Sequence, residues 1–318
     1  MSARAWSESL VATVVTLALC EGALRLAGYG PWAPFETFEG LPRMSDPHAS
    51  LGWVNRPGRH TVELGGRTVT VTVDERGDRA TPPSGGPRSV GLYGGSYLFG
   101  FGLDDTEVVS THLAAARPDL TVRNHAVPGY GTLQSVTALE ERVRSSGGCG
   151  EDVVVYGLTE LHDGRNVAAW SWLHALERSA RDQGWTVVPT AQWDGERLVV
   201  GEPVTYRHWS ASERSAIVNR AEHARNALHD RFLRTKAETT VQLVLRFREI
   251  VEVCGGAFRV ALLDAPTRSA VYLRRFAEEG VDVIDLRHPH FPEWSIPGDG
   301  HPDARVHADW ARRLAEVL

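Results

Sequence analysis

The chain changes character at residues 89–102, which read SVGLYGGSYLFGFG. Ser89 to Tyr93 is a short apolar run, and the two glycines after it allow a tight backbone turn in front of Ser96. A short apolar run that ends in a glycine turn is typical of a strand buried in a parallel sheet. Taken alone, the turn also fits an ordinary strand–helix connection. It does not fit a phosphate-binding P-loop, because the Gly-Lys-Ser/Thr ending is missing.

The remainder of residues 88–318 repeats this alternation of strand and helix. Four more apolar runs are predicted to be strands, at residues 121–127, 152–158, 258–263 and 281–286. Helical periodicity predicts helices at residues 107–116, 132–145, 212–253 and 304–317. Strands that alternate with helices predict an α/β fold, with helices on both faces of a doubly wound parallel sheet of five strands. Residues 88–318 would form this three-layer domain.

Two further regions differ from that pattern. Residues 33–87 are rich in glycine and proline, and they contain two alternating stretches at 60–66 and 67–75. These stretches predict a β-hairpin within a small β-containing N-terminal region. Residues 184–207 form a polar insertion in the second half of the chain.

Residues 1–32 contain a hydrophobic segment. Leu10 to Cys20 is uncharged but too short to span a bilayer as a helix. Leu10 to Ala27 is long enough if Glu21 and Arg25, which can pair on one helix face, are tolerated near one end. A membrane anchor with an extracytoplasmic domain is favoured. We then expect an isolated helix with few contacts to the domain, and with Trp6 and Trp32 near the membrane interfaces. A cleaved signal, or a helix buried in a cytoplasmic protein, are the alternatives.

Charge and cysteine content narrow the classes of function. The net charge is −6 and no run of five Lys or Arg residues occurs, which argues against a nucleic-acid partner. The three cysteines show no CxxC pattern, so no metal site or other cofactor is implied. Cys149 and Cys254 each precede a predicted strand core by four residues. If those strands are neighbours, the two thiols lie at the same sheet edge, close enough for a disulfide that would favour an extracytoplasmic domain.

Three loops carry the groups that a nucleophilic hydrolase needs. Ser96 follows the first strand, residues 124–131 (NHAVPGYG) follow the second, and GDGHP at residues 298–302 follows the fifth. The last of these places Asp299 two residues before His301, and a catalytic histidine needs such an acceptor to fix its tautomer. The alternative is a surface loop before the last helix, with Asp303 as its N-cap. His307 competes as a base, but its place within the last helix predicts that it faces away.

Together these segments resemble the SGNH/GDSL hydrolases over most of residues 89–318. SVGLYGGSYLFGFGLDD is similar to the family's nucleophile block, NHAVPGYGTLQ to its glycine block and GDGHP to its terminal block. DPHASLGWVNRPG and EGALRLAGY resemble the N-terminal part of bacterial, membrane-anchored members. The resemblance implies a flavodoxin-like sheet, with Ser96 as nucleophile, His301 as base and Asp299 as its orienting acid. It also implies that the backbone N–H groups of Ser96 and Gly129 stabilise the oxyanion.

One block departs from the family pattern. The family places an oxyanion-binding Asn soon after the third strand, where this chain reads YGLTELHDGRN. Thr159 stands near the expected position, and Asn166 comes seven residues later. The stretch resembles a subgroup with a histidine and an Arg-Asn pair, so His162, Arg165 and Asn166 are predicted to line the site. The alternative is that Arg165 and Asn166 only brace the following segment.

The resulting hypothesis is acyl transfer through a seryl ester, with water as the usual acceptor. The substrate would be a small acyl ester or an acylated glycan, and the resemblance favours acetyl groups on sugars. An O-acyltransferase using the same serine, or a non-catalytic glycan-binding domain, are the alternatives. Nothing in the sequence predicts the oligomeric state.

Overall fold

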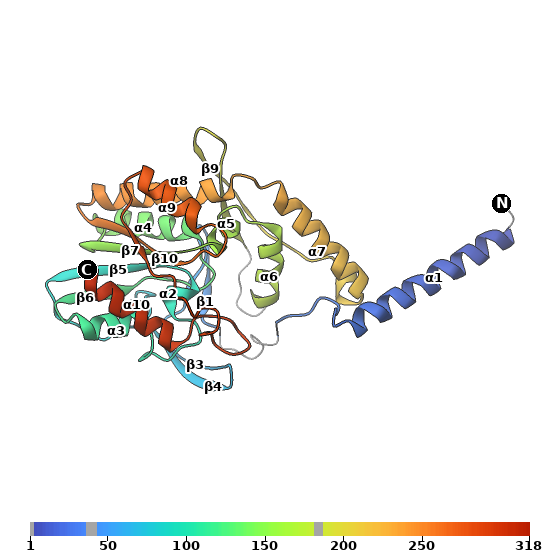
Figure 1. The fold of residues 1–318 in the computed structure, drawn as a ribbon, viewed down its shortest axis with the longest axis horizontal. Coiled ribbons are helices and arrows are strands. Elements are labelled where there is room, and N and C mark those ends of the chain that lie inside the picture. Colours follow the sequence, from blue (N-terminus) through green and yellow to red (C-terminus); the bar gives the residue numbers. More distant parts are fainter. Residues whose placement is uncertain (1–2, 36–42, 181–186) are drawn as a thin grey trace.

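A computed structural model describes residues 3–35, 43–180 and 187–318, and its centre is one parallel sheet (Figure 1). The strands lie side by side in the order β11-β10-β7-β5-β6. Each coincides with a predicted strand, so the doubly wound five-stranded sheet is confirmed. Numbered along the chain the order is 2-1-3-4-5, the flavodoxin-like arrangement. The strands are β5 (Arg88–Gly94), β6 (Leu120–Asn124), β7 (Val153–Thr159), β10 (Ala257–Asp264) and β11 (Val283–Asp285).

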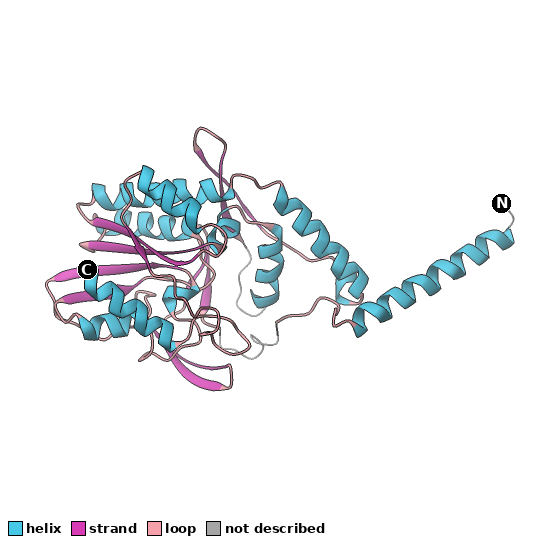
Figure 2. Cartoon of the chain, viewed as in Figure 1, coloured by secondary structure: helices cyan, strands magenta, loops and turns pink. Residues whose placement is uncertain are grey.

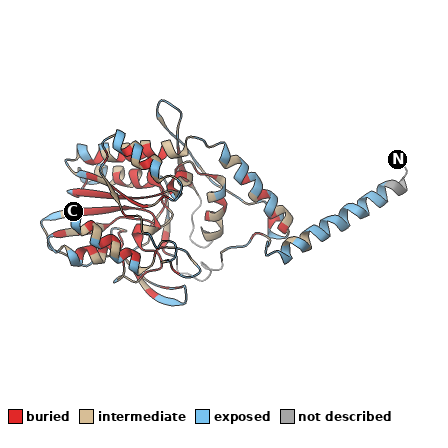
Figure 3. Ribbon diagram, in the orientation of Figure 1, coloured by how far each residue is buried: buried red, intermediate tan, exposed pale blue. Residues whose placement is uncertain are grey.

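Helices cover both faces of this sheet (Figure 2). One face packs against α3 (Val109–Ala116) and α10 (Ala304–Val317), whose Leu113, Trp310 and Leu314 are fully buried. The other face packs against α4 (Thr132–Ser146), α8 (Lys236–Val253) and α9 (Ser269–Glu278) through residues such as Phe247 and Phe276. Every residue of the central strand β7 is buried as a result (Figure 3).

The predicted helix at residues 212–253 is wrong, because the chain breaks there into three pieces. A short 3-10 helix, η2 (Ser210–Glu213), precedes α7 (Ala216–Arg231), and α8 follows after a turn. Ser215 begins α7 by accepting a hydrogen bond from the backbone N–H of Val218 at 3.3 Å. The break has a physical reason: α8 packs on the sheet, whereas α7 packs against α6 (Trp170–Ala180) outside it. Helical propensity alone does not reveal that change of direction.

The polar insertion contains a hairpin that the sequence did not predict. β8 (Val188–Trp193) and β9 (Leu198–Val204) pair antiparallel. The carboxylate of Asp194 closes the turn by accepting hydrogen bonds from the N–H groups of Glu196 and Arg197, both at 2.9 Å. Residues 184–186 of the insertion lie outside the described chain.

The predicted N-terminal hairpin is present as β3 (Gly58–Leu64) and β4 (Arg67–Val73). Its Val62, Val69 and Val71 belong to the same hydrophobic cluster as the sheet, so the hairpin packs directly on the α/β domain. A second pair, β1 (Ser45–His48) and β2 (Gly52–Asn55), precedes it. Residues 36–42 of this region lie outside the described chain.

The N-terminal helix α1 (Ala3–Leu26) projects from the body (Figure 1). Trp6–Leu26 is long and apolar enough to cross a membrane, and that window is not buried in the structure. Its C-terminal end, however, is fixed to the domain, because the Glu21 carboxylate accepts hydrogen bonds from the N–H groups of Ala216 and Ile217. The expectation for Trp32 is wrong: it is buried and stacks on His208, with ring centroids 3.7 Å apart.

The predicted cysteine pair is also present. Cys149 and Cys254 form a disulfide, with Cα atoms 5.8 Å apart. They meet at the edge of the sheet where β7 and β10 begin, because these two strands are direct neighbours. Among the described cysteines only Cys20 is free, and it is exposed on α1.

Candidate active site

Ser96, His301 and Asp299 form one hydrogen-bonded row beyond the carboxyl ends of the strands. The Oγ atom of Ser96 lies 2.8 Å from Nε2 of His301. On the other side of the imidazole, Nδ1 lies 2.5 Å from Oδ2 of Asp299. The ring is therefore held between an acceptor and a hydroxyl, which is the arrangement that lets a histidine remove a proton from a serine.

The turn after β5 delivers Ser96 to this position. Ser96 is the first residue of the short helix α2 (Ser96–Phe99) and is 5% exposed. Gly95 permits a close approach from behind, since a Cβ atom there would lie 3.0 Å from Nη1 of Arg165 and 3.1 Å from the Tyr130 carbonyl oxygen. The strand order changes direction between β5 and β7, and ligands of such sheets bind at that switch point.

The loop that carries the acid and the histidine folds on itself. The N–H group of Ile296 donates to the carbonyl of His301 at 2.8 Å, and Gly300 donates back to the carbonyl of Ile296. Asp299 also accepts from the backbone N–H of His301 at 3.2 Å, so the two residues form one local unit. Tyr97 and Phe101 place their rings against the imidazole, at centroid distances of 5.5 and 5.1 Å.

The competing histidine, His307, is turned away as predicted. It is fully buried, and its Nδ1 accepts a hydrogen bond from the backbone N–H of Val109 at 3.1 Å. Burial lowers the pKa of His307 to about 3. It therefore caps the start of α3 as a neutral side chain.

Gly129 lies in the loop after β6 and lines the same cavity as Ser96. Its φ of 85° is in the left-handed region, and an added Cβ would lie 2.9 Å from the Trp53 ring. Trp53 and Asn55 of β2 hold this loop: the indole N–H donates to the Pro128 carbonyl at 2.9 Å, and the Asn55 amide donates to Ala126 at 3.1 Å. Neither residue was predicted to support the site, although both lie in DPHASLGWVNRPG, the segment that resembles the N-terminal part of the family.

The backbone N–H groups of Ser96 and Gly129 are free of protein partners within the described chain. Both residues line one cavity together with His301. Unpaired N–H donors beside a nucleophilic oxygen are the elements of an oxyanion hole. The role of these two groups in binding an oxyanion stays a prediction.

The loop after β7 does not place its residues as expected. The Thr159 side chain is buried without a hydrogen-bond partner and does not line the cavity. Asn166 also lies outside the cavity, because its amide donates to Thr132 and Thr240 while its Oδ1 accepts from the N–H of Leu133. Asn166 braces the start of α4 and α8, and not the segment that follows it, as the alternative reading had it.

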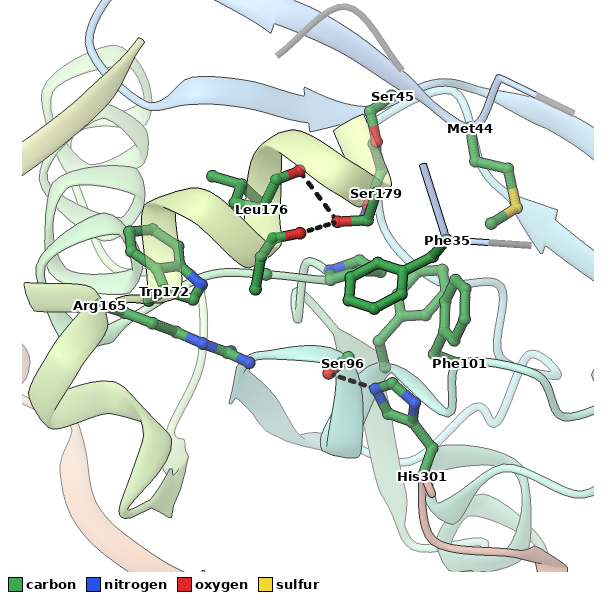
Figure 4. Close-up of a pocket in the computed structure, with 15 residues that line it drawn as sticks. Phe35, Met44, Ser45, Ser96, Phe101, Arg165, Trp172, Leu176, Ser179 and His301 are labelled. Atoms are coloured by element: carbon green, nitrogen blue, oxygen red, sulfur yellow. Dashed lines mark hydrogen bonds between the residues drawn. The ribbon is translucent and has the colours of Figure 1, made fainter. Parts of the chain in front are cut away.

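Arg165 is the member of this loop that reaches the cavity. Figure 4 shows its guanidinium pointing toward Ser96. Nη1 donates to the Tyr130 carbonyl at 2.9 Å, Nε is buried without a partner, and no described carboxylate lies within ion-pair distance. Burial lowers the pKa of Arg165 to about 10, so it stays charged at neutral pH. An unpaired cation is costly in a protein interior, which suggests that a negative charge arrives from the substrate side.

His162 lies behind the nucleophile turn and does not line the cavity. Its Nδ1 is 2.6 Å from the hydroxyl of Tyr156, and a Cβ on Gly95 would lie 3.3 Å from its Nε2. Burial holds the pKa of His162 well below its usual range, so the ring is neutral. It supports the turn that carries Ser96.

The cavity beside Ser96 is mostly apolar and has a volume of about 210 Å³ (Figure 4). Ser96, Gly129, Arg165 and His301 form its reactive end. The α6 helix supplies one wall through Trp172, Ala175, Leu176 and Ser179. Large apolar side chains form much of the remaining lining: Phe35, Met44, Phe99 and Phe101, beside Ser45, Asn55 and Pro128.

Comparisons with known proteins find similarity only among solved structures. No family model matches the chain, and no curated protein does. A lipolytic protein of the G-D-S-L family from Veillonella parvula is 10% identical, with 73% of this chain and 98% of that chain covered and a TM-score of 0.43. A psychrotrophic esterase from Pseudoalteromonas is 7% identical, with coverages of 72% and 95% and a TM-score of 0.41.

A catalytic mutant of an acetylxylan esterase from Geobacillus stearothermophilus is 11% identical. The match covers 73% of this chain and 94% of that one, with a TM-score of 0.40. At these identities and TM-scores, the similarities do not assign a function to this chain. The reaction is therefore inferred from the residues of the site itself.

Proposed function

We propose that this chain is a serine-dependent ester hydrolase of the SGNH/GDSL type. The observation that carries the proposal is the row Asp299–His301–Ser96, with distances of 2.5 and 2.8 Å, at the end of an apolar cavity. Three side chains from two distant parts of the chain meet in the order in which a nucleophile, a base and an orienting acid act. A glycan-binding domain would not require that row.

The reaction would proceed in two acyl transfers. Ser96 Oγ attacks the carbonyl carbon of the ester while His301 Nε2 takes the hydroxyl proton, and Asp299 accepts the hydrogen bond from Nδ1 of the imidazolium. The carbon–oxygen bond to the alcohol then breaks, and the alcohol leaves with the proton from Nε2. A water molecule, deprotonated by His301, then attacks the carbonyl carbon of the seryl ester. The bond to Ser96 Oγ breaks, Oγ takes the proton back from Nε2, and the carboxylic acid is released. Both half-reactions pass through a tetrahedral oxyanion.

Three donors would stabilise that oxyanion. The N–H groups of Ser96 and Gly129 have no protein acceptor, and the Arg165 guanidinium has no described counter-ion. We propose that Arg165 takes the role that the family gives to an Asn after the third strand, and that Thr159 does not. Preorganised donors of this kind act strongly in a cavity that excludes water.

The cavity favours an acyl group larger than acetyl. A cavity of about 150 Å³ accepts benzene, and this one has about 210 Å³ with aromatic and aliphatic walls. An acetyl group would leave most of it unfilled. Each buried methylene contributes about 0.8 kcal/mol, so a longer or aromatic acyl chain uses the cavity better. We therefore propose apolar acyl esters as the substrate class, in place of the acetylated sugars that the resemblance favoured.

The structure also supports a location for the enzyme. We propose that α1 anchors the chain in a membrane and that the domain lies on the extracytoplasmic side. The exposed apolar helix supports the anchor, since its window from Trp6 to Leu26 has no burial against the domain. The Cys149–Cys254 disulfide supports the compartment, because such bonds persist in oxidising surroundings.

Covalent labelling and paired substitutions test the catalytic proposal. Wild type should react with a fluorophosphonate probe at Ser96, and Ser96→Ala should not, whereas Ser145→Ala, at an exposed serine on α4, should label like wild type. Ser96→Ala and His301→Ala should each lose roughly 10³–10⁶ of kcat/KM on an activated ester, and the double variant should lose no more, because the residues act as a unit. Full activity in Ser96→Ala would refute the proposal.

A further inference from the structure

The helix α7 carries an outer face that the catalytic domain leaves open. Its buried residues, such as Asn219, Glu222 and Asn226, repeat at helical spacing and face the domain. The opposite side carries Ile217, Ala221, Ala224, Leu228 and Phe232, which follow one another at intervals of four, three, four and four residues. That spacing places them in one stripe along the helix. Leu228 is 56% exposed and Phe232 is 71% exposed.

Arginines flank this stripe. Five exposed arginines lie within residues 214–234: Arg214, Arg220, Arg225, Arg231 and Arg234. The only acids in that stretch are Glu222, which is fully buried, and Asp230, which accepts hydrogen bonds from the N–H groups of Trp170 and Ser171. The outer face is therefore cationic, although the whole chain has a net charge of −6. An apolar stripe between arginines is the composition of a helix that lies in a membrane interface.

The candidate anchor begins at the same place. Glu21 caps the start of α7 by accepting from the N–H groups of Ala216 and Ile217, and Arg25 donates to the Arg214 carbonyl at 2.9 Å. Figure 1 shows α1 and α7 meeting at this junction and running away from it in different directions. A bilayer that held α1 would thus come close to the start of α7.

The segment that joins α1 to the domain strengthens this junction. The Trp32 ring stacks on His208, and the backbone N–H of Trp32 donates to the Ser212 carbonyl at 2.7 Å, while the Asn219 amide donates to the carbonyl of Gly30. Tyr29 is 45% exposed and lies beneath the guanidinium of Arg220, 4.6 Å from its ring centroid. The connection is a docked segment and not a loose tether, so the anchor fixes which face of the domain turns toward the membrane.

We propose that the outer face of α7 rests on the membrane that α1 enters, with Leu228 and Phe232 among the headgroups and the arginines at anionic phosphates. The inference rests on the proposed anchoring by α1 and not on the proposed catalysis. It also places the cavity relative to the membrane, because α6 packs on α7 and forms the cavity wall with Trp172 and Leu176. The bilayer would lie one helix away from the space that we assign to the acyl group.

Depth-dependent fluorescence quenching on the full chain tests the inference. An environment-sensitive fluorophore is attached to Leu228→Cys or Phe232→Cys in a Cys20→Ser background, with the disulfide intact. The matched control is Val317→Cys, at an exposed apolar residue on α10, at the opposite end of the molecule from α1 in Figure 1. In vesicles with brominated phosphatidylglycerol and phosphatidylcholine, the labels on α7 should lose about half or more of their emission, because interfacial helices bury their apolar face among the headgroups and upper acyl chains. The control should lose little.

The proposed contact between the arginines and anionic phosphates is tested in the same vesicles. Replacing the anionic lipid by phosphatidylcholine, or combining Arg220→Gln with Arg231→Gln, should reduce the quenching at Phe232→Cys. Flotation of the chain with vesicles reports on α1 separately. Flotation without quenching at residues 228 and 232 would overturn the position of α7 and leave the anchor intact, and failure to float would overturn both. Concentration-dependent shielding of the labels in detergent would assign this face to self-association instead.

Discussion

The side-chain oxygen of Asn166 accepts a hydrogen bond from the backbone N–H of Leu133 at 3.0 Å, whereas the adjacent Arg165 points into the cavity beside Ser96. Two consecutive residues of one short helix, α5 (Leu161–Asn166), thus serve different purposes. Asn166 ties α5 to the start of α4 and to α8, and Arg165 faces the reacting groups. Substitutions at the two positions should separate stability from catalysis.

Replacing Asn166 should mainly reduce stability. Asn166→Leu removes the bonds to Leu133, Thr132 and Thr240 and leaves the N–H of Leu133 without its acceptor, which should cost roughly 1–3 kcal/mol in the free energy of unfolding. Denaturant unfolding measures that loss. Below the unfolding transition, the folded enzyme should keep kcat within about tenfold of wild type, because the side chain lies outside the cavity. A loss of kcat comparable with that of Arg165 variants would contradict this assignment.

Replacing Arg165 should reduce catalysis and leave stability almost unchanged. Arg165→Met keeps most of the side-chain volume but removes the charge and the donors, so kcat should fall by roughly 10²–10³ with little loss of stability. Arg165→Lys should recover only part of the rate, because an ammonium does not reproduce the fork of the guanidinium. Arg312→Met, at an exposed arginine on α10, is the control. If Arg165→Met raises KM without lowering kcat, the residue binds the substrate and the transition state equally and gives the oxyanion no additional stabilisation.

The acyl-chain preference should follow the volume of the cavity. Across p-nitrophenyl esters from acetate upward, kcat/KM should rise by about fourfold per methylene until the cavity is full, the factor that corresponds to about 0.8 kcal/mol per group. Leu176→Trp should shorten the optimum by filling the α6 wall, and Leu176→Ala should lengthen it. A maximum at acetate in wild type would reject the apolar acyl group while leaving the hydrolase intact.

Gly129→Ala should damage the site through its backbone. The φ of 85° strains any side chain there, and the new Cβ would meet the Trp53 ring at 2.9 Å. We expect the free energy of unfolding to fall by roughly 1–3 kcal/mol. The loss of kcat/KM should exceed what this loss of stability explains, because the loop that bears an oxyanion donor must shift. Gly148→Ala, where a Cβ meets open space, should leave both unchanged. Wild-type activity in Gly129→Ala would contradict an oxyanion role for this loop.

A buried charge network beside the sheet should make stability depend on pH. His125 lies between Asp78 at 2.6 Å and Glu151 at 2.9 Å. Burial lowers the pKa of His125, but its hydrogen bonds to the two carboxylates outweigh that effect and raise the pKa overall. The network's contribution is therefore complete below the ordinary histidine pKa of about 6.5 and is lost as pH rises through the raised value.

Comparison of wild type with His125→Gln tests whether the network stabilises the protein at low pH and not at high pH. The difference in unfolding free energy should be roughly 1.5–3 kcal/mol near pH 6, because the substitution removes the cation hydrogen-bonded between two buried carboxylates, and it should shrink at alkaline pH. Urea unfolding at a series of pH values, with the disulfide intact, measures it. A difference that grows with pH would mean that His125 is neutral in the native state.

The sequence by itself determined the sheet, its strand segments and the loops that bear the reactive residues. The length of the apolar runs and the glycine and proline breaks beside them indicated the five strands of this sheet. Parallel strands then bring Ser96 and the loop of His301 to one edge whatever the side-chain details. The same reasoning placed Cys149 beside Cys254, since consecutive strands of such a sheet are usually neighbours. These features depend on local pattern and on sheet topology, and both can be read along the chain.

The direction of side chains within the site was decided only by the tertiary structure. Thr159, His162, Arg165 and Asn166 lie in one stretch of eight residues, yet only Arg165 enters the cavity. The division of residues 212–253 between α7 and α8 likewise depends on which surface each half packs against. A helical stretch presents its residues all round its axis, and sequence spacing does not say which side meets the cavity and which meets a neighbouring helix. The packing of α4, α8 and β8 against α5 supplies that information.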